Sequence, residues 1–171
     1  MQTKTVLNLI RFRLNLSNEL HIDSAELITN FVLLWSVYEK RFYAVTENTS
    51  CDQHRMLAKV NSDFFEGTVF KPYFDDFKTR YLEDESKFTS LRLGTGKPYS
   101  GFEDAIRNRF MSNPNENEMA ESVLGIIYRL RNNLFHGVKN LAEYNLELEP
   151  IEIANRCLFD VIKNNRFLDE R

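Results

Sequence analysis

Apolar residues recur at intervals of three and four along most of this chain, the spacing of one face of an α-helix. The clearest case is residues 22–45, where Asp23 and Glu26 form a candidate N-terminal capping box and Ile22 can contact Leu27 as a hydrophobic staple. The periodicity predicts that one face of this helix is buried. That face comprises Leu27, Phe31, Leu34, Trp35, Tyr38, Phe42 and Val45.

Capping residues and helix-initiating prolines mark the starts of further helices along the chain. A Ser or Asn followed three residues later by Glu or Gln is a capping box, and proline is favoured in a first helical turn. No segment alternates apolar and polar residues as a strand would, so the pattern predicts an all-α bundle. The start signals are Ser50 with Gln53, Pro72, Ser100 with Glu103, Asn115 with Glu118, and Pro150.

Residues 86–99 are the least regular stretch and are predicted to form a surface loop. They contain the letters GTGK, which resemble part of a phosphate-binding loop. The first glycine of that motif is missing, and Pro98 follows Lys97 where a Ser or Thr is required. The stretch therefore does not predict a nucleotide-binding site.

Length and composition are those of a globular protein with a single domain over residues 1–171. The chain is 43% apolar and 27% charged, which excludes a disordered chain, and its length suffices to bury a core. No apolar run approaches the length of a membrane span, and Asn8, Arg11 and Arg13 interrupt the N-terminal segment unlike a signal peptide. These features predict a cytoplasmic protein that does not enter a membrane.

The charge and the few metal-binding residue types narrow the possible chemistry. A net charge of -3 argues against nucleic-acid binding by the whole surface and leaves a local basic patch open. Cys51 and Cys157 form no disulfide framework, and no Cys and His residues have the spacing of metal ligands. We therefore expect neither a metal nor another cofactor.

The helix expected over residues 116–136 carries the candidate chemistry at its C-terminal end, in the sequence RNNLFHG. Arg131 falls at the edge of the apolar stripe of this helix, so it is not expected to extend fully into water. Gly137 follows as a typical C-terminal cap. The stripe comprises Ala120, Val123, Leu124, Ile127, Leu130 and Leu134.

A second face of the same helix carries Gly125, Arg129, Asn132 and His136, again at intervals of three and four. This spacing places Asn132 where it can hydrogen-bond His136 or hold a group on which His136 acts. Gly125 has no side chain and would let another helix approach closely. We expect this face to lie near a two-fold axis in a homodimer.

Purely structural roles remain open for both charged residues of this stretch. Arg131 can serve an ion pair, for instance with Glu39, because half-buried arginines near helix ends often do. His136 can cap carbonyl groups of the last turn and interact favourably with the negative end of the helix.

Taken together, the stretch resembles the R-x(4–6)-H signature of the HEPN superfamily. Four residues separate Arg131 from His136, and Asn132 matches the polar residue that often follows the arginine. The earlier helix with Trp35 and Tyr38 resembles the aromatic-rich early helix of HEPN bundles. The resemblance implies a HEPN-like helical bundle that dimerises, here with an inserted helical region at about residues 50–115.

The resemblance also implies a function, because many HEPN proteins are metal-independent endoribonucleases of toxin–antitoxin, abortive-infection or antiphage systems. It assigns catalytic roles to Arg131, Asn132 and His136 in a composite site at a dimer interface. Arg129 and Lys139 are candidate RNA contacts beside it. The expected partners are an RNA substrate, a second copy of the chain and an antitoxin or other regulatory protein. The alternative is a non-catalytic HEPN-like module that binds a partner protein or nucleic acid.

One departure from the family pattern concerns regulation. In HEPN toxins paired with a minimal nucleotidyltransferase, a tyrosine that becomes modified follows the histidine by two positions. That position holds Val138, and Tyr144 lies too far along to replace it. Neutralisation through tyrosine modification is therefore not expected.

Overall fold

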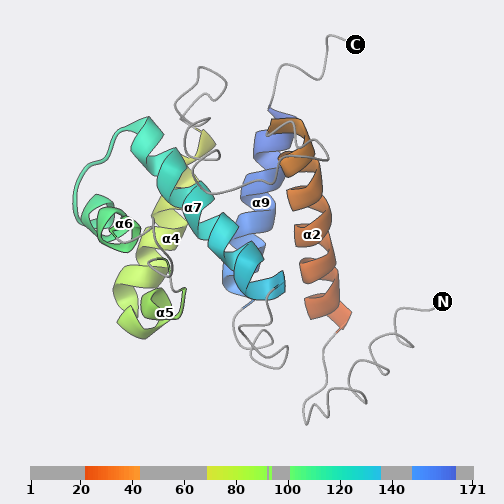
Figure 1. Cartoon of the computed structure of the whole chain (residues 1–171), viewed down its shortest axis with the longest axis horizontal. Helices are drawn as coiled ribbons and strands as arrows, with labels where there is room; N and C mark the ends of the chain where they lie inside the picture. Colours follow the sequence, from red (N-terminus) through yellow and green to blue (C-terminus); the bar gives the residue numbers. More distant parts are fainter. Residues whose placement is uncertain (1–21, 43–68, 92, 94–100, 136–147, 165–171) are drawn as a thin grey trace, which may run out of the picture.

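The computed structural model describes residues 22–42, 69–91, 93, 101–135 and 148–164. These residues form helices with no strand among them, so the predicted all-α class is confirmed. Figure 1 shows how the helices are arranged. They are α2 (Ile22–Phe42), α4 (Lys71–Glu83), α5 (Glu85–Ser90), α6 (Phe102–Met111), α7 (Glu116–Phe135) and α9 (Glu149–Lys163).

Helix α7 is the central element of the bundle. It packs against α4, α6 and α9, and its Tyr128 ring lies 6.0 Å from the ring of Trp35 in α2. Every residue over positions 122–127 is buried, so this part of the helix is covered on all sides. A helix surrounded in this way is stabilised mainly by removal of apolar surface from water.

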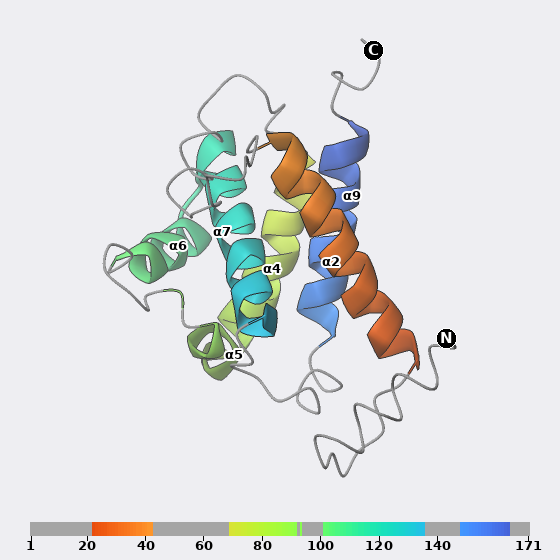
Figure 2. The same ribbon diagram turned by 45° about the vertical axis from the view of Figure 1, so that its right-hand side comes forward.

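Helix α2 lies at one edge of the bundle, beside α9 (Figure 2). Of its predicted buried face, Leu27 and Leu34 are half-buried, and the side chains of Phe42 and Val45 lie outside the described part of the chain. Phe31, Trp35 and Tyr38 are almost fully buried, and Asn155 of α9 donates a hydrogen bond of 2.9 Å to the Leu27 carbonyl. The helix begins at Ile22, one residue before the predicted cap. The side chains of Ile22 and Asp23 lie outside the described part of the chain, so the staple and the cap stay predictions.

Helix α4 supplies an aromatic ladder to the core. Pro72 lies in its first turn as predicted, and the rings of Phe77 and Tyr81 stack at 5.9 Å. Phe74 contacts Phe110 of α6 at 5.3 Å between ring centroids. Although this helix falls inside the region expected as an insertion at about 50–115, it packs against both α7 and α9. It is therefore part of the core of the bundle.

The loop prediction for residues 86–99 is wrong in its first part, because α5 occupies Glu85–Ser90. The Asp84 side chain caps this helix by accepting from the backbone N–H groups of Ser86 at 3.0 Å and Lys87 at 3.4 Å. Phe88 is buried, which secures the short helix against the core. The GTGK letters lie outside the described residues.

The start signals of the remaining helices have mixed outcomes. Asn115 and Glu118 form the predicted capping box, with reciprocal bonds of 3.0 and 2.8 Å, and Pro150 lies in the first turn of α9. The box at Ser100 is wrong, because Gly101 is the N-cap of α6, with φ of 106° and no side-chain cap bond. Glu103 instead pairs with Arg107 one turn later at 3.4 Å. The segment after Ser50 lies outside the described residues.

Candidate functional site

The candidate site begins where α7 emerges from the bundle at its C-terminal end. Arg131 and Asn132 are both half-buried there, in contrast to the fully buried middle of the helix. The Arg131 Nη1 atom donates to Asn132 Oδ1 at 3.0 Å. Because a guanidinium has only donors, it must meet the amide oxygen, and the Nδ2 donor of Asn132 points away from it. The pair thus presents donor groups in two directions.

His136 follows directly after Phe135, the last residue of α7. His136, Gly137 and Lys139 all lie outside the described residues, as do Val138 and Tyr144. The expected placement of the imidazole near Asn132 therefore stays a prediction, as do the glycine cap and the RNA contact of Lys139.

Arg129 has a structural contact across to the chain that leaves α5. Its Nε atom donates to the Leu91 carbonyl at 2.9 Å, and Asn133 Nδ2 donates to the same oxygen at 3.4 Å. Leu91 is 3% exposed, so both donors satisfy a buried acceptor. These bonds, from residues on either side of the Arg131–Asn132 pair, tie α7 to the chain that leaves α5. The RNA contact of Arg129 remains a prediction.

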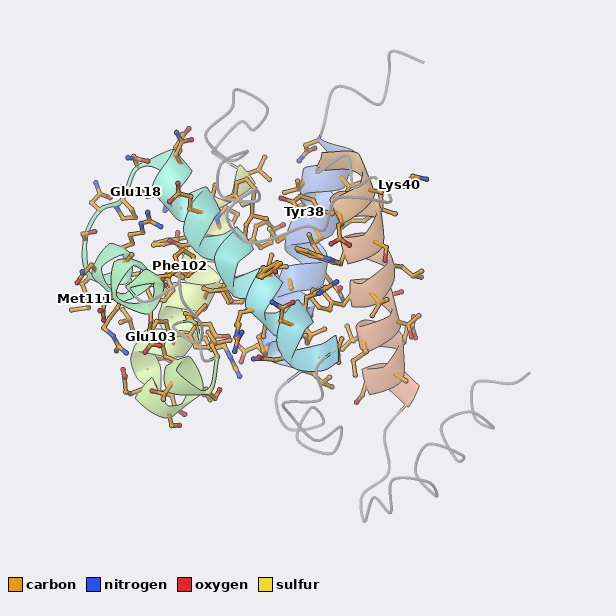
Figure 3. All side chains as sticks on the ribbon, viewed as in Figure 1. Tyr38, Lys40, Phe102, Glu103, Met111 and Glu118 are labelled. Carbon is orange, nitrogen blue, oxygen red and sulfur yellow. The ribbon has the colours of Figure 1, made fainter. Side chains whose placement is uncertain are left out.

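Gly125 admits a helix of the same chain. A Cβ atom at this position would overlap the ring of Phe102, which lies between α6 and α7 (Figure 3). The expected close approach thus exists, but it is made by α6 and not by a second copy. Gly125 is buried by this contact, so this part of the expected dimer face is wrong.

An ion pair between Arg131 and Glu39 is disfavoured by the direction of the helices. Helices α2 and α7 run in opposite directions (Figure 1), and they meet where Trp35 contacts Tyr128. Glu39 lies one turn beyond Trp35, toward the start of α7, whereas Arg131 lies toward its end. Asn132 is a hydrogen-bond partner of Arg131 in the structure.

The polar groups between α4 and α9 form a separate, structural cluster. The Tyr73 hydroxyl donates to Asp160 Oδ2, and burial together with this bond raises the pKa of Tyr73. Burial likewise raises the pKa of the Cys157 thiol, which is 0% exposed. A thiol held protonated in this way is a poor nucleophile. Within the described ranges, no three His, Cys, Asp or Glu side chains gather as metal ligands.

Sequence reasoning missed Asn133 and Leu91, although both shape the end of α7. Asn133 is 2% exposed and lies four residues after Arg129, a spacing that puts two donors on one helix face. That spacing was the available signal, but their shared acceptor is a backbone carbonyl 38 residues from Arg129. Main-chain acceptors of this kind have no residue signature.

Comparisons with known proteins add no identification. No protein-family model, no curated protein and no solved structure matches the chain significantly. Of the helices in the described ranges, none combines the length and the apolar character that crossing a membrane requires.

Proposed function

We propose that this protein is a metal-independent endoribonuclease of the HEPN type, with Arg131, Asn132 and His136 as its catalytic residues. The supporting observation is the Arg131–Asn132 hydrogen bond of 3.0 Å near the end of α7, about one helical turn before His136 in the sequence. The pair lies where a central helix of an all-α bundle leaves the core, which gives it rigid support on one side and solvent access on the other.

RNA cleavage needs few groups from the protein, because the substrate carries its own nucleophile. The 2′-hydroxyl loses a proton and its oxygen bonds to phosphorus, while the bond from phosphorus to the 5′-oxygen breaks and that oxygen gains a proton. The products are a 2′,3′-cyclic phosphate and a 5′-hydroxyl. Proton transfer near neutral pH is the task to which an imidazole is best suited, so His136 takes it.

Arg131 stabilises the charge that gathers on the phosphorus oxygens in the transition state. A guanidinium offers planar donors that match two oxygens at once, and it stays charged at all relevant pH values. Asn132 accepts one guanidinium hydrogen bond and so restricts the orientation of the Arg131 side chain. Its amide nitrogen points away from Arg131 and orients either the imidazole or the phosphate.

The reaction needs two proton transfers, which supports a composite site formed by two copies of the chain. One proton leaves the 2′-hydroxyl and another reaches the 5′-oxygen, whereas each chain has a single motif histidine. Two chains facing each other supply a base and an acid together. In the toxin–antitoxin, abortive-infection or antiphage setting that we propose, a regulatory protein controls the site, and Arg129 and Lys139 add contacts to RNA.

The test is incubation of the purified protein with total RNA and with tRNA in excess EDTA. We expect cleavage by the wild type and by His54→Ala, and a loss of roughly a hundredfold or more in His136→Ala, the usual effect of a general acid–base group. The ends formed should be cyclic phosphate or 3′-phosphate, and 5′-hydroxyl. Growth arrest on expression should disappear with the same variant.

The substrate provides a sharper test of the mechanism. Replacing the ribose 5′ to the cut by deoxyribose should abolish cleavage, because the nucleophile is then absent. Efficient cutting of that strand, or a strict need for Mg²⁺, contradicts the mechanism. A folded protein that binds but never cuts RNA is instead a non-catalytic module.

A further inference from the structure

Among the described helices, only α2 carries two exposed large apolar side chains, Leu33 and Val37. Both lie on the side of α2 that we call its outer face. We define it as Thr29, Leu33, Ser36 and Val37, bounded by Glu26 and Lys40. Leu33 is 59% exposed and Val37 is 46% exposed. The opposite side of α2 packs against α9, and Lys40 points away from the bundle (Figure 3).

The two hydroxyl residues of this face are bonded within the helix. Thr29 Oγ1 donates to the Ala25 carbonyl at 2.7 Å, and Ser36 Oγ donates to the Val32 carbonyl at 2.8 Å. Their hydrogens are therefore satisfied without water, and burying them leaves no unpaired donor. Both side chains are short, so another helix can approach closely beside Leu33 and Val37.

The charges that bound the outer face are arranged symmetrically about its centre. Glu26 and Lys40 each lie seven residues from Leu33, both are exposed, and they carry opposite charges. Seven residues correspond to two helical turns, or roughly 10 Å along the axis. An identical helix laid antiparallel across Leu33 therefore brings each glutamate opposite the lysine of the other copy. A parallel arrangement brings like charges together.

We propose that a second copy of the chain docks on the outer face of α2, antiparallel and centred on Leu33. This contact is isologous, because the same patch is used by both copies and each charge pair occurs twice. It does not rest on the proposed ribonuclease function and uses no residue of the Arg131 site. Where the composite site also forms, each chain takes part in two different two-fold contacts.

The contact is modest in strength. A single pair of helices covers less than the roughly 1,200–2,000 Å² of a standard stable interface, so dissociation in the micromolar range is expected. The apolar pair Leu33 and Val37 supplies the attraction, and the Glu26–Lys40 pairs select the antiparallel orientation.

The experiment measures molar mass by light scattering and sedimentation across a micromolar concentration series. The mass of the largest wild-type species should halve in Leu33→Glu, because a buried unpaired charge opposes docking. Met111→Glu is the matched control, since Met111 is 74% exposed on α6, and it should leave the mass unchanged. Circular dichroism should show the same helical content in all variants.

Charge exchange tests the orientation even where Leu33→Glu is too severe. Glu26→Lys and Lys40→Glu should each weaken association about tenfold, which corresponds to 1.4 kcal/mol, and the double variant should restore it. Absence of restoration, or an assembly mass that Leu33→Glu leaves intact, overturns the proposal. RNA cleavage is measured on the same variants, so a failure of the ribonuclease proposal is seen separately from a failure of docking.

Discussion

Asn132 and Asn133 are neighbours in α7, yet they belong to two different regions of the molecule. Asn133 is 2% exposed and reaches the Leu91 carbonyl, where it joins Arg129 in tying α7 to the chain after α5. Asn132 is half-buried and accepts from Arg131 within its own helix. One amide side chain helps to hold the bundle together, and the other shapes a pair at its surface.

The difference arises from the 100° rotation between successive helical residues. At the end of α7, one face bonds to the Leu91 carbonyl after α5, while the adjacent face is half-buried. The same amide side chain therefore anchors α7 on one face, at Asn133, and forms part of the candidate site on the next, at Asn132. We call Arg129, Asn133 and the Leu91 carbonyl the anchoring region, and Arg131 with Asn132 the site region. We expect the anchoring region to control stability and the site region to control activity.

The largest expected effect is on activity, at Arg131. Arg131→Ala should lower RNA cleavage by roughly a hundredfold or more, because it removes a fixed cation from the developing phosphate charge. Asn132→Ala should lose less, as an orienting residue. Cleavage rates and far-ultraviolet circular dichroism are the measurements. Arg156→Ala, which removes an exposed ion pair of 2.9 Å with Asp76, is the control and should cut RNA normally.

The site region is contradicted if Arg131→Ala unfolds the protein. Arg131 would then be an anchoring residue like Arg129, and the difference between the two faces of α7 would disappear.

The next effect is on stability, at the Leu91 carbonyl. Arg129→Met and Asn133→Leu each leave this buried oxygen one of the two donors and should cost about 1 kcal/mol or less. Asn133→Leu also removes Oδ1, which finds no hydrogen-bond partner among the described residues, so its cost is kept small. The double variant removes both donors that the described residues offer to the oxygen and should cost roughly 1–3 kcal/mol beyond the sum. Urea unfolding of the four proteins measures this coupling. Simple additivity would mean that the two side chains do not share an acceptor.

A smaller effect is expected at the other end of α7. Asn115→Ala removes the bond from the Asn115 side chain to the Glu118 N–H and should cost about 1 kcal/mol. Cleavage should be unchanged, because this end lies far along the helix from Arg131. Thermal unfolding is the measurement, and Asn117→Ala, an exposed residue of the same turn, is the control. A loss of cleavage equal to that of Arg131→Ala would couple the two ends.

The smallest effect concerns alkaline pH and the contact between α4 and α9. The pKa of Tyr73 is raised in the folded protein, so the contribution of this tyrosine is complete below the ordinary pKa of about 10 and is lost above it. Tyr73→Phe should be less stable by about 1 kcal/mol at neutral pH, and this deficit should shrink as pH rises past that value. Urea unfolding of both proteins at neutral pH and above the ordinary tyrosine pKa measures this deficit. A deficit that grows with pH would contradict the prediction.

Local signals in the sequence predicted much of the fold. The periodicity of residues 22–45 identified the buried Phe31, Trp35 and Tyr38, and the Asn115 box and Pro150 marked real helix starts. These features depend on contacts within a few residues along the chain. The errors were local too: Asp84 started a helix inside a predicted loop, and Gly101 replaced Ser100 as a cap.

The candidate site was identified from sequence only as a set of residues on one helix. Spacing placed Arg131 at the edge of the apolar stripe, the resemblance to the HEPN signature joined it with Asn132, and both are half-buried in the structure. Spacing also grouped Gly125 and Arg129 with Asn132 and His136 on one face, which was expected to lie near a dimer axis. In the structure, Phe102 lies against Gly125, and Arg129 donates to the Leu91 carbonyl. Both Phe102 and Leu91 come from segments distant from α7 along the chain.

What the sequence by itself determined is the helical class, several helix starts and the order of residues around each helix, because these follow from backbone sterics and hydrophobic spacing. Only the tertiary structure decided which face of α7 stays open, since that depends on where α6 and the chain after α5 lie against it. The same holds for the outer face of α2. Spacing left Leu33 and Val37 off the predicted buried face, and the packing of the opposite side of α2 against α9 leaves them exposed.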